Sequence, residues 1–404
     1  MILLPDMQPS LRSLISALDP SDLICLPAQE FIDIPLSGIE YDSRKIRPGN
    51  LFVALRGIHS DGHDFIDAAL DRGASALIHE KALTRPYPGI ACAQVRDSRA
   101  AMSRLAAAFY GRASSSLITI GVTGTEGKST TVYLIYQLLN LAGLKSGFFS
   151  TVMSDTGTGE RPNPEHQTTP EATAVQRMLA EMRDSGCCCA VVEASSHGLS
   201  PRTARLADVD FDLAVMTNVT SEHLEFHGSW DCYRSDKANL FRNLDAHDHS
   251  KNLACSGWNK GKPIPSFAIV NADDPSAEYF GKSTNKPLLS FSARGAKASF
   301  AAKEIRSDAR GSSFLIQGPF QQGETLPEGK RIEAEARIEL PGQFNVGNSL
   351  AALAVASSVL GRSWTELLEF LPLLKPVKGR MNLVELGQPF EVIIDYAHTP
   401  SSFE

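Results

Sequence analysis

The chain of 404 residues is too long for one compact core, so two or three domains are expected. Its 43% hydrophobic and 21% charged residues are typical of globular proteins, and its net charge of −7 argues against a broad nucleic-acid surface. No stretch approaches the about 20 apolar residues that span a bilayer, and the start MILLPDMQPSL lacks the basic flank of a signal peptide. We therefore expect a cytoplasmic protein with neither a membrane span nor a nucleic-acid partner.

The first predicted unit covers residues 1–114. Strand-like runs at LFVAL, SALIHE and IACAQV alternate with a helix-like run, HDFIDAALDRGA, which predicts a small α/β domain. A second helical pattern, SRAAMSRLAAAFYG, then leads into the polar linker RASSSL.

The second predicted unit covers residues 115–378. Apolar strands (LITIGVT, CCCAVVEAS, DLAVMTNV, SFAIVNADD) alternate with amphipathic helices (TTVYLIYQLLNLAG, TAVQRMLAEMRDSG), which predicts a mostly parallel sheet covered on both faces. GSSFLIQG and RIEAEARIEL break this pattern. The alternation of apolar and charged residues in RIEAEARIEL predicts a small antiparallel β appendage with one wet face.

The last unit, residues 379–404, has a hairpin-like pattern in MNLVELGQPFEVIIDY. A new strand with few residues after it is not a domain. We expect the start of a third, Rossmann-like domain, most of which would be missing because a typical domain has about 100–150 residues.

The seven cysteines are odd in number, and none shows the C-x-x-C spacing typical of metal or redox sites. Three of them are adjacent in CCCAVVEAS, where neighbouring side chains of a strand point to opposite faces. We expect a buried strand in which cysteine serves as a small apolar residue.

A glycine-rich loop, GVTGTEGKST at residues 121–130, lies between a predicted strand and a predicted helix. The usual phosphate loop has Gly six positions before its Lys, where this chain has Val122. Backbone N–H groups of Gly124 to Ser129 can still converge on phosphate oxygens at a helix N-terminus. Lys128 would contact the β- and γ-phosphates, and the Ser129 hydroxyl would bind Mg²⁺.

This loop resembles that of the Mur ligases and their folylpolyglutamate synthetase relatives, with glycines spaced as Gly121, Gly124 and Gly127 are here. Glu126 replaces the usual Asn and Ser129 the usual Thr. Further segments resemble the family in order, over nearly the whole chain: YDSRKIRPGNLFVALRG, VVEASSHGL, TNVTSEHLEFHG, YRSDKANLF, VNADDP, GQFNVGN, VKGRM and DYAHTP. They are most similar to the member that adds the third residue of the peptidoglycan peptide.

Glu193 follows an apolar strand, at the carboxyl edge of the predicted sheet, where ligand sites cluster. Oxygen ligands suit Mg²⁺, which favours Glu193 with Ser129 over an ordinary exposed strand end. The resemblance implies that His223 binds a second Mg²⁺ and that Lys237 is carbamylated (N6-carboxylysine), an anionic oxygen donor. A structural histidine and a plain surface lysine are the alternatives, and Asp236 replaces the usual Ala.

The resemblance also implies substrate contacts. Ser43 matches the uridine-binding segment, and positions contacting the sugar, pyrophosphate or peptide are Thr168, Thr169, Ser195 and Arg205. Two extra residues after His197 make Arg202 an alternative to Arg205, and Thr169 before Pro170 has helix capping as its alternative.

The ATP contacts implied are the loop residues Gly124, Thr125, Glu126, Gly127, Lys128, Ser129 and Thr130, with Asn271, Asn348, Arg380, Asp395 and His398. Asn271 and Asn348 would lie near the adenine, Arg380 at the γ-phosphate, and Asp395 with His398 at the ribose. The alternative for the basic run KPVKGRM is a solvated linker.

The resemblance implies an ATP- and Mg²⁺-dependent amide ligase acting through an acyl phosphate. Its catalytic residues would be Lys128, Glu193, His223, Lys237 and Arg380. Its partners would be UDP-N-acetylmuramoyl-L-Ala-D-Glu, ATP and a free amino acid, and we expect a monomer. The alternatives are a sister Mur ligase or folylpolyglutamate synthetase-like enzyme, and a nucleotide- and UDP-sugar-binding form that is inactive without the rest of its third domain.

Overall fold

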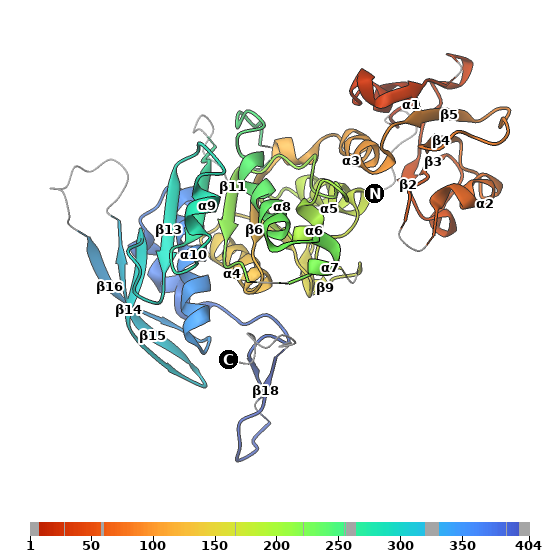
Figure 1. The fold of residues 1–404 in the computed structure, drawn as a ribbon. Coiled ribbons are helices and arrows are strands. Elements are labelled where there is room, and N and C mark those ends of the chain that lie inside the picture. The colour runs from red at the N-terminus through yellow and green to blue at the C-terminus, as the bar shows by residue number, and fades with distance from the viewer. Residues whose placement is uncertain are drawn as a thin grey trace. The chain divides into compact units, whose positions relative to one another are not determined.

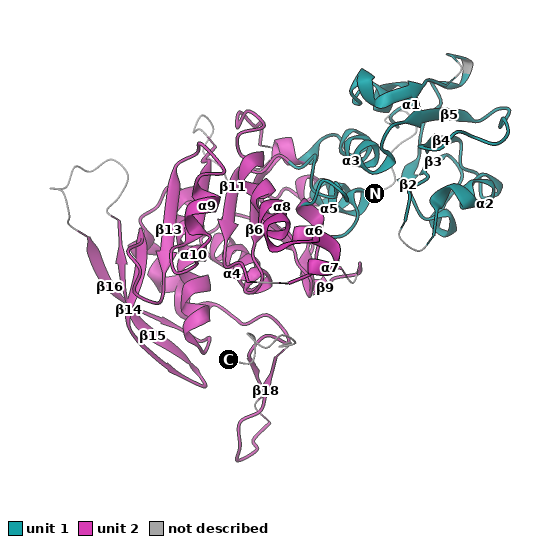
Figure 2. Ribbon diagram, viewed as in Figure 1, with its two compact units in different colours: residues 1–113, 170–181, 200–209 teal, residues 114–169, 182–199, 210–404 magenta. Residues whose placement is uncertain are grey.

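The structure is a computed structural model that describes residues 8–27, 29–57, 60–165, 167–220, 222–253, 255, 264–319, 331–384 and 386–395. His398 lies outside the described residues. Contacts divide the chain into two compact units, coloured in Figure 2. Unit 1 comprises Met1–Ala113, Pro170–Glu181 and Ser200–Val209, and unit 2 comprises Ser114–Thr169, Met182–Leu199 and Asp210–Glu404.

Unit 1 contains a five-stranded sheet in the order β1-β5-β4-β3-β2 (Figure 1). Strands β2 to β5 pair in parallel and β1 is antiparallel. The strands are β1 (Leu23–Cys25), β2 (Gly38–Glu40), β3 (Asn50–Val53), β4 (Ala76–His79) and β5 (Ala91–Val95), and the helices are α1 (Leu11–Ile15), α2 (Ile66–Asp71) and α3 (Ser98–Phe109). This confirms the small α/β domain predicted from the sequence.

Alternate residues of β3 explain how this sheet is covered. Leu51 and Val53 pack in the core formed with α1 and α3, whereas Phe52 packs in the core formed with α2. Successive side chains of a strand point to opposite faces, so helices cover both faces.

Unit 2 contains an eleven-stranded sheet in the order β16-β15-β14-β13-β12-β11-β6-β10-β7-β8-β9. Within this order, every neighbouring pair between β14 and β7 is parallel. Antiparallel pairs extend the sheet at both ends, through β15 and β16 at one end and through β8 and β9 at the other. The strands are β6 (Ile118–Thr123), β7 (Ser146–Phe149), β8 (Met153–Asp155), β9 (Arg161–Pro162), β10 (Cys189–Glu193), β11 (Leu213–Met216), β12 (Phe267–Asn271), β13 (Leu288–Ser292), β14 (Phe300–Asp308), β15 (Gly311–Gly318) and β16 (Ile332–Ile338). The mostly parallel sheet and the antiparallel appendage are therefore both confirmed.

Two sets of helices cover opposite faces of this sheet (Figure 1). Ile120 and Val122 of β6 pack with α4 (Lys128–Leu141) and α10 (Gln343–Leu360). Gly121, between them, faces Leu240 of α8 (Trp230–Asn243). The other helices among the described residues are α5 (Ala172–Asp184), α6 (Ser196–Leu199), α7 (Leu224–His227) and α9 (Ala277–Gly281), with 3-10 helices at Pro20–Asp22, Gln29–Phe31, Ser43–Lys45, Gly62–Phe65, Ala113–Ser116 and Trp364–Leu373.

Adding one methyl group at Gly121 is expected to destabilise the protein. The new Cβ would meet Leu240 Cδ1 and lie 3.0 Å from two ring carbons of Phe211. Overpacking a dense core costs about 1–3 kcal/mol, so Gly121→Ala should lower the free energy of unfolding by that amount in urea denaturation. Gly347→Ala is the matched control, because its Cβ would make only ordinary contacts of 3.7 Å and it lies in helix α10. An unchanged stability of Gly121→Ala would contradict the packing described here.

Cys187, Cys188 and Cys189 are all buried, as predicted, although the strand itself begins only at Cys189. The prediction that each serves as a small apolar residue is wrong for Cys188. Its sulfur is bonded to that of Cys255 in a disulfide that joins positions 67 residues apart. The sequence carried no sign of this pairing because nothing in it places the two residues together.

After α10, strands β17 (Asn382–Leu383) and β18 (Ile393–Ile394) pair as the predicted hairpin. None of the helices in the described part of the chain combines the length and the apolar character needed to cross a bilayer.

Candidate active site

The phosphate loop connects β6 to α4 and rests on the end of the neighbouring strand β11. Thr125 N–H donates to the Asn218 carbonyl (2.8 Å), and Glu126 N–H donates to Asn218 Oδ1 (2.9 Å). The Thr217 hydroxyl donates to the Glu126 carbonyl (2.6 Å). Thr217 and Asn218 were not among the predicted site residues, although they stand in the motif TNVTSEHLEFHG.

Gly124 makes this close approach possible. A Cβ there would collide with Thr217 Oγ1 and lie 3.1 Å from the Asn218 carbonyl. Overpacking at such a site costs about 1–3 kcal/mol. If that cost falls on the ATP-binding conformation of the loop, Gly124→Ala should weaken ATP binding about 10- to 100-fold while the rest of the fold stays intact. The assay is ATP titration. Gly143→Ala is the control, because that glycine also has positive φ (+88°) but a methyl group added to it would meet no other atom of the described residues within 4 Å.

Lys128 begins α4, is half-buried, and donates from Nζ to the Thr125 carbonyl at 2.7 Å. Burial lowers the pKa of Lys128, while Glu193 and Glu222 oppose that shift and Arg380 adds to it. The site thus gathers two basic side chains, Lys128 and Arg380, near two carboxylates. A bound phosphate would stabilise the charged form of Lys128.

Glu193 ends β10 and is 1% exposed. Its carboxylate accepts hydrogen bonds from Ser129 Oγ (2.9 Å), Thr151 N (2.8 Å) and Thr151 Oγ1 (3.1 Å). The carboxylate and hydroxyl oxygens form a hard donor set that fits Mg²⁺. Thr151, whose Oγ1 also lies 3.0 Å from Thr168 Oγ1, was missed by sequence reasoning; its only signal was its place just after β7.

Thr169 and Ser195 lie at the same strand end. The Thr169 hydroxyl donates to the Glu193 carbonyl (2.9 Å) and accepts from Ser195 N–H (3.0 Å). Ser195 Oγ accepts from Gly198 N–H (3.0 Å) at the start of α6. The structure therefore brings Glu193, Thr168, Thr169 and Ser195 together.

His223 precedes α7 in a left-handed backbone conformation (φ 55°) that few non-glycine residues adopt. Its side chain is 44% exposed, with Nδ1 3.4 Å from Glu225 Oε1 and Nε2 3.6 Å from Glu222 Oε1. Its ring centre lies 4.9 Å from that of His197. Glu222 is a further residue that sequence reasoning missed, and its signal was its position beside His223.

Lys237 lies on α8 and is 1% exposed. Its Nζ donates to the Gly124 carbonyl (2.5 Å) and lies 4.5 Å from the centre of the Tyr233 ring. Burial lowers the pKa of Lys237 well below its ordinary value, and the like charge of Lys128 lowers it further, against Glu222 and Glu193. Lys237 is therefore not a surface lysine, and its amine is held toward the neutral form.

Asp236, the departure noted beside Lys237, has its own partner. Its Oδ2 lies 2.7 Å from Nδ1 of His227, whose Nε2 lies 3.1 Å from Ser196 Oγ. The His227 side chain is fully buried. Asp236 thus orients His227, which contacts the first residue of α6.

The remaining predicted ATP contacts have these positions. Asn348 of α10 accepts from Thr131 Oγ1 (3.1 Å) and contacts Gly127 of the loop. Asn271, at the end of β12, donates to the Thr217 carbonyl (2.8 Å). Asp395 is exposed beside the β17–β18 hairpin and accepts from Met381 N–H (2.8 Å).

Two predicted substrate residues belong to unit 1. Ser43 is buried in a 3-10 helix capped by Asp42, which also pairs with Arg44 (2.8 Å). Beside it is a pocket of about 480 Å³ whose lining includes Arg44, Lys45, Arg47, Asn50 and Tyr110. Arg205 donates to Glu171 (2.7 Å), whereas Arg202 is exposed.

Strand β6, the glycine loop and helix α4, with Glu193 at the neighbouring strand end, define a P-loop-type nucleotide-binding α/β protein.

Comparison with known proteins narrows this class. Residues 122–356 match the family model of the Mur ligase middle domain, and residues 35–110 match that of the Mur ligase family catalytic domain. The chain is 47% identical to a UDP-N-acetylmuramyl-tripeptide synthetase of Treponema pallidum, over 91% of this chain and 69% of that protein. It is 38% identical to a UDP-N-acetylmuramoyl-L-alanyl-D-glutamate--2,6-diaminopimelate ligase of Geobacillus kaustophilus, over 91% and 68%.

A solved structure of a UDP-N-acetylmuramoyl-L-alanyl-D-glutamate--2,6-diaminopimelate ligase superposes with a TM-score of 0.73 and 27% identity, over 98% of this chain and 72% of that one. The chain belongs to the Mur ligase family.

Proposed function

We propose that this chain joins an amino acid to UDP-N-acetylmuramoyl-L-Ala-D-Glu with the energy of ATP. It is an ATP-dependent ligase of peptidoglycan synthesis that adds the third amino acid. The observation that carries the proposal is the cluster of Lys128, Ser129, Glu193 and Lys237 around the phosphate loop, at the carboxyl ends of β6 and β10. The chain that contains this cluster is 47% identical to a tripeptide synthetase.

The reaction must bring two anions together. An oxygen of the D-Glu side-chain carboxylate attacks the γ-phosphorus of ATP, and ADP leaves. The amine nitrogen then attacks the acyl carbon of the acyl phosphate, and inorganic phosphate and a proton leave. Lys128 and Arg380 are the cations proposed to offset the charge of the phosphates, since the pKa of Lys128 responds to Arg380 and to Glu193.

Ser129 and Glu193 are proposed to hold one Mg²⁺, which would neutralise phosphate charge when bound. Their oxygens are 2.9 Å apart and buried together. Thr151 orients the Glu193 carboxylate by donating to both of its oxygens. His223 is proposed as a ligand of a second Mg²⁺, with carbamylated Lys237.

Carbamylation of Lys237 is supported by its environment. Only a neutral amine attacks CO₂, forming an N–C bond and releasing a proton, and burial favours that neutral form. The product would be an anionic oxygen donor beside Lys128. The positive charge of Lys128 disfavours the ammonium form of Lys237 and, by the same argument, would favour the negatively charged carbamate.

The deciding experiment is calorimetric titration of the chain with UDP-N-acetylmuramoyl-L-Ala-D-Glu, with and without Mg-ATP. We expect the UDP-dipeptide to bind more tightly than the UDP-tripeptide. We also expect ADP to form when an amino acid is added. Binding of Mg-ATP without the UDP-dipeptide would favour a sister ligase. Binding of both without ADP formation would favour a non-catalytic form.

Glu126 is expected to weaken ATP binding. It lies close enough to Lys128 to raise that lysine's pKa, so it places a negative charge near bound phosphate. We expect Glu126→Asn to tighten Mg-ATP binding about 3- to 10-fold at low salt, the effect of removing one like charge near the surface. Glu335→Gln, on the exposed side of β16, makes the same charge change away from the loop and should leave the affinity unchanged. Equal effects of both variants would contradict a local role.

A further inference from the structure

A second cluster of metal-binding side chains lies at the opposite edge of the unit 2 sheet. Asp212 immediately precedes β11, so it marks the amino end of the parallel strands, whereas the phosphate loop follows the carboxyl end of β6. His247 and His249 lie in the irregular segment after α8. This cluster is therefore separate from the nucleotide site.

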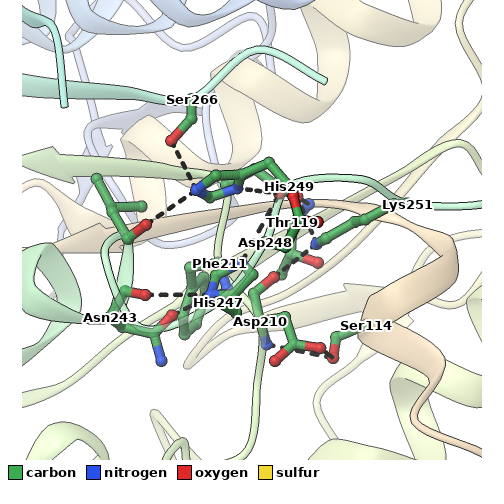
Figure 3. A network of polar contacts seen from close by, with 12 residues as sticks. Ser114, Thr119, Asp210, Phe211, Asn243, His247, Asp248, His249, Lys251 and Ser266 are labelled. Atoms are coloured by element: carbon green, nitrogen blue, oxygen red, sulfur yellow. Dashed lines mark hydrogen bonds and ion pairs between the residues drawn. The ribbon is translucent and has the colours of Figure 1, made fainter. Parts of the chain in front are cut away.

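The three side chains converge on one point. Asp212 is fully buried, and its Oδ1 lies 2.9 Å from His249 Nδ1 and 4.0 Å from His247 Nε2. These ligand atoms all lie within 4.8 Å of one another. Figure 3 shows both imidazoles in the same polar network.

The outer nitrogens of both rings are bound to backbone carbonyls. His247 Nδ1 donates to Asn243 O (3.1 Å), and His249 Nε2 donates to Leu244 O (2.9 Å). A carbonyl only accepts, so these nitrogens carry the ring hydrogens. Histidine ligands of metals commonly have this second hydrogen bond, because it fixes the tautomer whose other nitrogen faces the ion.

His247 Nε2 consequently presents a lone pair toward the Asp212 carboxylate. This atom is buried and has no hydrogen-bond partner among the described residues. A buried acceptor facing an anion is unfavourable, and a cation between them would satisfy both.

Lys251 is the competing cation. Its Nζ lies 2.5 Å from Asp212 Oδ2, which also accepts from Thr119 N–H (2.8 Å). These partners occupy Oδ2 and leave Oδ1 toward the histidines. The ammonium charge lowers affinity for any cation, and two imidazole nitrogens with one carboxylate oxygen suit zinc rather than Mg²⁺.

We propose that Asp212 Oδ1, His247 Nε2 and His249 Nδ1 bind one divalent transition-metal ion of the zinc class. Binding displaces the proton between His249 Nδ1 and Asp212, and the ion ties the segment after α8 to the start of β11. The role is structural, because the site lies at the sheet edge away from the phosphate loop.

The test uses the untagged chain, stripped with chelator and held in excess Mg²⁺ so that the proposed nucleotide site does not take the probe. Zn²⁺ is titrated calorimetrically, and Co²⁺ serves as a visible-absorption probe. We expect one equivalent to bind, with Co²⁺ absorption typical of nitrogen and oxygen ligands. Changing a residue that only supports a metal ligand weakens metal binding about 10- to 100-fold. Removing a ligand itself should cost more, so His247→Asn and His249→Asn should each weaken Zn²⁺ binding at least about 100-fold.

His223→Asn is the matched control, because it removes a histidine of the nucleotide site and should leave this Zn²⁺ binding unchanged. If the His247 and His249 variants do not fold, the wild type still decides: Zn²⁺ should raise its melting temperature and chelator should reverse the shift. No binding by the wild type, or equal binding by His247→Asn/His249→Asn, would overturn the proposal and leave a metal-free ionic network of Asp212, His249 and Lys251.

Discussion

Lys237→Met is expected to reduce ligase activity at least about 1,000-fold without lowering the free energy of unfolding. The activity falls because methionine cannot become a carbamate and so removes a proposed anionic ligand, a loss comparable to that of other preorganised charge-stabilising groups. Stability is kept because the variant exchanges a fully buried amine for an apolar side chain of similar length. Activity and urea denaturation measure the two effects.

The stability difference should depend on pH with a definite sign. In the chain kept free of CO₂, where Lys237 is an amine, its folded-state pKa is lowered, so between that pKa and the ordinary 10.5 the unfolded chain binds more protons than the folded one. Wild-type stability therefore gains from Lys237 as pH rises, and the advantage of Lys237→Met should shrink as the pH approaches the ordinary lysine pKa of 10.5. A constant difference would show that Lys237 has an ordinary pKa.

Lys251→Met is the contrasting variant for stability. Lys251 is also buried, but its Nζ lies 2.5 Å from Asp212, so its removal leaves a buried carboxylate short of a partner. It should destabilise the chain by about 3–5 kcal/mol.

A rescue experiment tests the carbamate at Lys237. Acetate should partly restore the activity of Lys237→Ala, because it supplies a carboxylate in the space of the lost group. Restoration by methylamine instead would favour a free amine.

Glu193→Gln is expected to abolish the dependence of ATP binding on Mg²⁺ and to reduce turnover about 1,000-fold. The amide is uncharged, and its NH₂ cannot accept the bonds that Ser129 and Thr151 donate to both carboxylate oxygens. A lost acceptor in this buried position should also lower the free energy of unfolding by about 1–3 kcal/mol. The measurement is ATP titration at several Mg²⁺ concentrations.

Glu171→Gln is the matched control, since Glu171 is also a buried carboxylate but binds Arg205 in unit 1. It should weaken binding of the UDP-dipeptide and leave the Mg²⁺ dependence of ATP binding intact. If both variants changed the Mg²⁺ dependence equally, Glu193 would not be the specific ligand.

Local patterns in the sequence were enough for the main elements and for the phosphate loop. β6, β10, β11 and β12 are short apolar runs, and α4 has a helical period, so neighbouring residues alone specify them. β16 was predicted as a half-exposed antiparallel strand because its residues alternate, and its burial alternates likewise. Gly124 and Lys128 were identified because a loop between strand and helix carries its chemistry in consecutive residues.

Helix α10 shows where such patterns fail. It is buried on nearly all sides, from Asn345 to Val359, and so lacks the apolar stripe by which a surface helix is recognised.

Other features depend on residues that only folding brings together. Thr151 binds Glu193 across 42 positions, Cys188 bonds Cys255, and Asp212 meets His249 across 37. Each of these residues is ordinary among its sequence neighbours. The parallel sheet aligns strand ends from distant parts of the chain. The order of the strands therefore decides which residues meet at the carboxyl ends of the strands and which meet at their amino ends.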